Sequence, residues 1–130
     1  MTTKTIHSSE IKWYLSYEIL CFEYEKKKDT QEEILVWENL ILIQANDPER
    51  AYLKAVNHGR LSEEKLLIND KKGLCKFKGI KKLVPIYEEL SDGSEIEWRE
   101  YEFTKDKLRK MIPPKKKLQA FQPLTDFEEV

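Results

Sequence analysis

Two stretches in the first third of the chain have the hydrophobic pattern of β-strands. From Ile11 to about Glu25 the side chains alternate between two faces, and one of these faces is wholly apolar. Residues 34–37 and 40–43 are instead apolar on both alternating faces. A strand of this second kind must be covered on both faces or lie centrally in a sheet. The polar residues 26–31 separate the two stretches, so they most simply form an antiparallel hairpin.

A helix is predicted directly after the second strand. Asp47 is a favourable N-cap, Pro48 suits the first helical position, and Gly59 suits the stop after the last turn. Small side chains on one stripe of this helix would let it lie close against the sheet. That stripe consists of Ala51, Tyr52, Ala55 and Val56.

The second half of the chain predicts shorter elements. Strands are expected at about 65–69 and 74–78, separated by a turn and ended by a break at Gly79. Pro85 denies the apolar segment around it a central place in the sheet. A further strand is expected from Ile96 to Phe103, after a turn at 91–94.

Thr104 is then expected to cap a short helix, which ends at the two prolines Pro113 and Pro114. Together the elements predict an α+β fold, with an antiparallel sheet of about four to five strands, one main helix packed on one face and a short C-terminal helix. The single globular domain is expected at 11–114, between a flexible N-terminal arm at 1–10 and a charged C-terminal tail at 115–130. The predicted core includes Leu15, Ile19, Trp37, Leu40, Leu42 and Val56.

The order of these motifs resembles one bacterial family, the domain of unknown function 4288. The resemblance covers about residues 11–114 and implies a small protein without an assigned activity, so it supplies no functional residues to carry over. The motifs that carry it are Trp13-Tyr14, Val36-Trp37-Glu38-Asn39, Asp47-Pro48-Glu49 with Ala51, Ala55 and Gly59, Phe77-Lys78-Gly79, Leu83-Val84-Pro85-Ile86-Tyr87 and Asp92-Gly93.

Composition and charge exclude more than they suggest. The 130 residues carry a net charge of −1, which gives no overall signal for nucleic acid or membrane. No run approaches the roughly 20 apolar residues of a membrane span, and no secretory signal is visible. Cys21 and Cys75 are expected to be reduced, buried residues, which predicts a cytoplasmic location.

The charges are nevertheless segregated along the chain. Segments 65–82 and 105–117 each carry seven bases against one acid, whereas 83–104 carries seven acids against one base. If the basic segments shared a face, the resulting patch could contact phosphates. The alternative, which we favour, is that strands of opposite charge pair and cancel. The candidate basic patch is Lys71, Lys72, Lys76, Lys78, Lys81, Lys82, Lys115, Lys116 and Lys117.

Few residues offer catalytic or metal chemistry. His7 and His58 have no second ligand at helical spacing, so no metal or other cofactor is expected. Nothing in the sequence brings a cysteine to a histidine, and apolar strands raise rather than lower the pKa of a thiol. Glu38 interrupts an apolar strand and should therefore be paired, with Arg99 as the expected partner in a buried ion pair. A role for Glu38 in ligand recognition stays open.

The aromatic residues exceed what a core of this size needs, and a remainder on one sheet face would suit a protein partner. We therefore expect a non-catalytic protein-binding or regulatory module, for example an inhibitor, whose partner is another protein or a second copy. A nucleic-acid-binding accessory protein is the alternative, and an enzyme has the least support. The candidate interaction surface is Trp13, Tyr14, Tyr17, Tyr87, Trp98 and Tyr101.

Overall fold

The computed structural model describes residues 11–26 and 33–123. It has four strands, β1 (Trp13–Tyr24), β2 (Leu35–Gln44), β3 (Glu64–Ile68) and β4 (Lys71–Ile86), and a main helix α1 (Pro48–Leu61) between β2 and β3. A short helix α2 (Lys105–Met111) and two turns of 3-10 helix (Lys115–Lys117 and Gln119–Phe121) follow. The predicted N-terminal arm and the last residues of the predicted tail lie outside the described residues.

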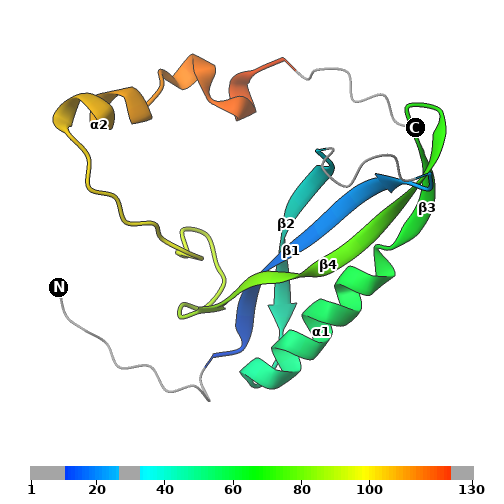
Figure 1. Ribbon diagram of the computed structural model, residues 1–130. Coiled ribbons are helices and arrows are strands. Elements are labelled where there is room, and N and C mark those ends of the chain that lie inside the picture. Colours follow the sequence, from blue (N-terminus) through cyan, green and yellow to red (C-terminus); the bar gives the residue numbers. More distant parts are fainter. Residues whose placement is uncertain (1–10, 27–32, 124–130) are drawn as a thin grey trace. The chain divides into compact units, whose positions relative to one another are not determined.

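The strands form one antiparallel sheet in the order β2-β1-β4-β3 (Figure 1), which confirms the predicted α+β fold. β1 and β2 pair over ten residues in uninterrupted register, from Trp13 opposite Gln44 to Phe22 opposite Leu35. The β1–β4 pairing has two register shifts, which flank Gly79 and Ile80. The residues left out of the pairing are Lys78 and Lys81, and Gly79, with φ of 145°, lies between these two irregularities. The sequence had suggested that a strand ends at Gly79, but β4 continues through it.

Pro85 lies within β4 and pairs with Tyr14 of the central strand β1. This part of β4 nevertheless lies at the edge of the sheet, as the proline had led us to expect. β3 pairs with β4 only from Lys71 to Cys75, so no described strand flanks β4 on its other side at Pro85. The missing N–H of the proline costs no ladder hydrogen bond there.

A two-residue turn joins β3 to β4. Asn69 and Asp70 both adopt positive φ, at 50° and 65°. Asparagine and aspartate tolerate this left-handed conformation better than other side chains, and it matches the twist of the flanking strands. This turn sets the register in which Ile68 faces Lys71.

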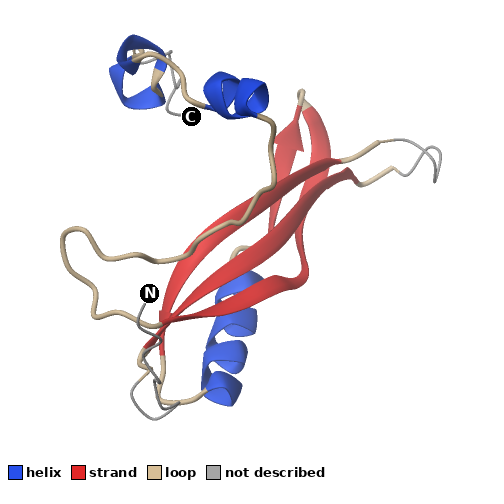
Figure 2. Cartoon of the chain, turned by 90° about the vertical axis from the view of Figure 1, so that its left-hand side faces the viewer, coloured by secondary structure: helices blue, strands red, loops and turns tan. Residues whose placement is uncertain are grey.

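α1 covers one face of the sheet, and both views place it on the same side of the strands (Figures 1 and 2). Its N-cap Asp47 accepts a hydrogen bond from the backbone N–H of Arg50. The buried helix residues are small, which allows the close approach that the sequence predicted. The cluster beneath the helix consists of Ile11, Tyr14, Ile43, Ala51 and Ala55.

Gly59 does not end α1, because the helix continues to Leu61 and is capped at Ser62. The glycine is needed for packing instead. A Cβ at position 59 would overlap the ring of Phe77 on β4. The helix and strand therefore approach most closely at this point.

The opposite face of the sheet has a smaller core. Leu15, Tyr17 and Ile86 are buried there, with Trp13, Val84 and Leu90 packed against them. Leu90 comes from the segment after β4, so that segment supplies part of the cover on this face.

Half of the residues predicted to form the core are exposed instead. Leu15 is buried, and Ile19 and Val56 are partly buried. Trp37, Leu40 and Leu42 are each about half exposed, at 49–52%. The apolar pattern of β2 had indicated a central or doubly covered strand, but β2 is an edge strand of the described sheet.

The chain divides into two compact units, the first ending at Trp98 and the second beginning at Arg99. The strand predicted from Ile96 to Phe103 does not form. In the second unit Thr104 caps α2 as expected by accepting from the N–H of Lys107. None of the residues described in α2 is buried. No helix in the described ranges is long and apolar enough to cross a membrane.

Candidate protein-binding edge

β2 exposes large apolar side chains on both of its faces. Pairing with β1 places Leu35 and Trp37 on the face that carries α1, and Val36, Leu40 and Leu42 on the opposite face. Together with Ile34 just before the strand, these side chains are 49–55% exposed. Trp37 is held edge-on against Phe22 of β1, with ring centroids 4.8 Å apart. The edge strand thus offers apolar contact area on two sides of an open backbone ladder.

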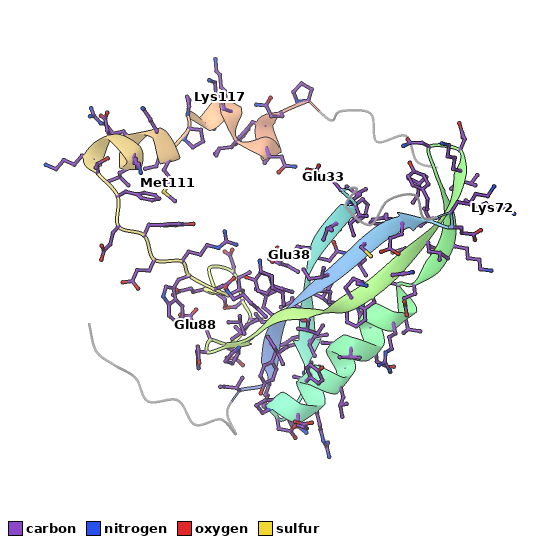
Figure 3. All side chains as sticks on the ribbon, in the orientation of Figure 1. Glu33, Glu38, Lys72, Glu88, Met111 and Lys117 are labelled. Atoms are coloured by element: carbon purple, nitrogen blue, oxygen red, sulfur yellow. The ribbon has the colours of Figure 1, made fainter. Side chains whose placement is uncertain are left out.

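The electrostatics of this edge are simple. Glu38 is the one charged residue in β2, and Lys81 of β4 lies 3.3 Å from its carboxylate. Figure 3 shows Glu38 on β2. The predicted ion pair therefore exists with a different base and on the surface, so both Arg99 as partner and the expected burial of Glu38 are wrong. Because Lys81 neutralises Glu38, β2 presents a nearly uncharged edge.

The other edge strand, β3, has the features that usually discourage association. It is only five residues long and begins with two charged residues, Glu64 and Lys65. Where β4 extends past β3, the N–H of Phe77 lies 3.4 Å from the carboxylate of Glu63, which can accept from it. Short length and charge are common ways to protect an edge. β2 is twice as long and has neither a lysine nor a bulge.

The aromatic residues predicted to form an interaction surface are not all exposed. Tyr14 and Tyr17 are buried on opposite faces of the sheet, and Trp13 is partly buried. Tyr101 belongs to the second unit, where its ring stacks on that of Phe103 at 4.9 Å. The prediction that Tyr14 and Tyr17 face solvent is therefore wrong, because both serve the two cores.

Tyr87 and Trp98 are exposed, at 48% and 66%, and line a hollow of about 410 Å³ after the end of β4. Four carboxylates surround it: Glu88, Glu89, Glu95 and Glu97. Aromatic faces and carboxylates together favour a cationic group over an anionic one.

Three of the six lysines of β4 are paired with acids. Lys76 pairs with Glu23 at 2.9 Å, Lys81 with Glu38, and Lys82 with Glu97 at 2.7 Å. The last of these pairs joins the basic segment to the acidic one. Lys71, Lys72 and Lys78 are exposed on the same strand, and Lys115, Lys116 and Lys117 belong to the second unit.

A buried carboxylate that the sequence reasoning missed is Glu18, which is 1% exposed beneath α1. Nδ1 of His58, near the end of α1, lies 2.9 Å from both of its oxygens. Two signals were available. Glu18 interrupts an apolar strand as Glu38 does, and His58 follows Ala51 and Ala55 on the helix stripe that faces the sheet. The pair fastens α1 to β1, although the His58 side chain is still 47% exposed.

This pair resembles the carboxylate–histidine half of a hydrolytic triad, but among the described residues no hydroxyl or thiol is hydrogen-bonded to the His58 ring. Ser16 is buried two residues away, and its Oγ has no hydrogen-bond partner in the described structure. Cys21 and Cys75 are free, buried thiols on opposite faces of the sheet, and burial raises the pKa of both. No group of three potential metal ligands occurs in the part of the chain that the structure describes.

The fold is a small α+β domain with two edge strands, of which β3 is short and charged and β2 is long and apolar. The family model for a domain of unknown function, DUF4288, matches residues 13–98, and the chain therefore belongs to this family. The match ends at the last residue of the first compact unit. Neither the curated proteins nor the solved structures contain a significant match to the chain.

Proposed function

We propose that this protein is a non-catalytic protein-binding module that works in the cytoplasm and binds its partner along β2. The observation that carries the proposal is the ten-residue edge strand with large apolar side chains exposed on both faces. An extended segment of a partner can add to such an edge, because main-chain hydrogen bonds supply affinity and side-chain contacts supply specificity.

The alternative function, nucleic-acid binding through the lysine segments, has weaker support. Three lysines of β4 are engaged by carboxylates, and a hollow with four glutamates follows the end of the same strand. An enzymatic role has less support, because in the described residues no hydroxyl or thiol is hydrogen-bonded to the His58 ring and no group of three potential metal ligands occurs.

A capture experiment tests the proposal. Tagged wild-type protein is incubated with an extract of cells that produce the untagged chain, beside the variant Leu40→Glu. Leu40 is half exposed on β2, so a glutamate there places negative charge on the edge, close to Glu38, with little effect on the core. Leu67→Glu is the matched control, because Leu67 is 67% exposed on the other edge strand. Capture of the untagged partner should be lost with Leu40→Glu and kept with Leu67→Glu; equal capture by both variants would exclude β2 as the binding edge.

A further inference from the structure

We propose that the partner on β2 is a second copy of this chain, joined by antiparallel β2–β2 pairing around a two-fold axis at Asn39. This inference rests on the proposed function and names the occupant of the edge. Two four-stranded sheets would then form one continuous sheet with β2 of each copy at its centre.

The hydrophobic pattern of β2 is that of an inner strand. An apolar strand of this kind belongs at the centre of a sheet, yet in one chain it is an edge strand. Pairing with a second β2 removes the contradiction, because each β2 gains a strand on its open side. Strand β1, which pairs with β2, already has this central position, and seven of its twelve residues are buried.

The register follows from side-chain chemistry. Antiparallel pairing about a two-fold axis perpendicular to the sheet sets residues of the same face opposite each other. With the axis at Asn39, Val36 faces Leu42 of the second copy, and Trp37 faces Ile41. The two Asn39 amides meet at the axis. An axis at Glu38 would place two carboxylates directly opposite each other, which is unfavourable.

Charge and orientation permit the same arrangement. Glu38 faces Leu40 of the second copy in this register, and each Glu38 keeps its own Lys81. A perpendicular two-fold axis leaves both α1 helices on one side of the joined sheet. α1 starts after the end of β2 and runs toward β3, away from the open edge (Figure 1).

The contact area also agrees with a dimer. A large apolar side chain has about 200 Å² of surface. Residues 34–37, 40 and 42 are each about half exposed. Together they therefore expose roughly 600 Å² of apolar surface per copy along β2. A standard interface buries about 800 Å² per partner, and the backbone of the paired strands adds to the apolar contribution.

Sedimentation of the full chain at micromolar concentration tests the assembly. The wild-type protein and the Leu67→Glu variant should sediment with twice the mass of one chain. Leu40→Glu should sediment with the mass of one, because the introduced carboxylate would face Glu38 of the second copy. A wild-type protein that is monomeric at these concentrations would overturn the proposal. So would a dimer that survives Leu40→Glu.

Cysteine cross-linking tests the register independently of whether Leu40→Glu folds. In the variant Asn39→Cys, the two introduced thiols face each other with Cα atoms about 4.5–5.5 Å apart, a separation that a disulfide can span. Val36→Cys is the matched control, because its thiols would be about 20 Å apart, six residues along the strand. Oxidation should link only the Asn39→Cys chains into dimers; efficient linking of Val36→Cys, or none of Asn39→Cys, contradicts the register.

Different results would show that the self-pairing is wrong and that β2 is not the binding edge. If the chain is monomeric but a different protein is captured in a Leu40-dependent way, the self-pairing is wrong and the binding edge stands. If capture and mass are both unchanged by Leu40→Glu, the binding edge itself is wrong.

Discussion

The buried pair of Glu18 and His58 shows how a single contact fastens the helix to the sheet. His58→Ala leaves a carboxylate buried without its partner, so it should lower the free energy of unfolding by about 1–3 kcal/mol. Denaturant unfolding measures this loss. In a Glu18→Gln background the same substitution should cost clearly less, because the uncompensated charge is absent. Equal losses in both backgrounds would mean that the pair is not coupled.

Gly59 gives a second test at a single position. Alanine is usually the better helix residue by about 1 kcal/mol, but here its Cβ would overlap the Phe77 ring. Overpacking costs about 1–3 kcal/mol, so Gly59→Ala should destabilise the protein in thermal or denaturant unfolding. Removing the ring with Phe77→Leu should reverse the sign, and Gly59→Ala should then be neutral or stabilising. An unchanged penalty in the Phe77→Leu background would contradict this reading of the glycine.

The residues that the sequence located well are those whose role depends on near neighbours. Asp47 at the start of α1, the Asn69–Asp70 turn and Thr104 at the start of α2 act through partners a few positions away. Glu18 and Glu38 could not be told apart in the same way. Both interrupt apolar strands, but Glu18 lies on a central strand beneath α1, whereas Glu38 lies on the edge strand and on the opposite face.

The hydrophobic patterns of β1 and β2 predicted their positions in the sheet unequally well. The alternation in β1 predicted a long strand, and β1 is central. The pattern of β2 also indicated a central place, and within one chain it lies at the edge. Periodicity reports which side chains prefer burial, but not whether the same chain provides the cover. The proposed self-pairing of β2 would account for the difference.

Central and edge strands should therefore respond differently to truncation. Leu15→Ala in β1 removes a buried side chain and should lower the free energy of unfolding by about 2–5 kcal/mol. Leu67→Ala in β3 removes an exposed one and should change it by less than about 0.5 kcal/mol. Urea unfolding of the two variants measures both values. A similar cost at the two positions would contradict the assigned burial.

The charge pairs across the whole chain lead to a prediction about nucleic acid. With three β4 lysines engaged by carboxylates, we expect no affinity for mixed-sequence DNA or RNA tighter than about micromolar at physiological salt. Fluorescence anisotropy with a labelled oligonucleotide provides the measurement. Tight binding that falls steeply between roughly 50 and 200 mM salt would favour the basic segments as a phosphate-binding surface instead.

The central claim is that β2 is an open edge in one chain and an inner strand in the pair. Hydrogen exchange of the wild-type protein at low and high concentration tests it most directly, because strand pairing slows amide exchange. Protection of residues 35–43 should rise several-fold with concentration, while peptides from β3 stay unchanged. If the amide protection of β2 does not change with concentration and equals that of β3, β2 is not an inner strand of a pair.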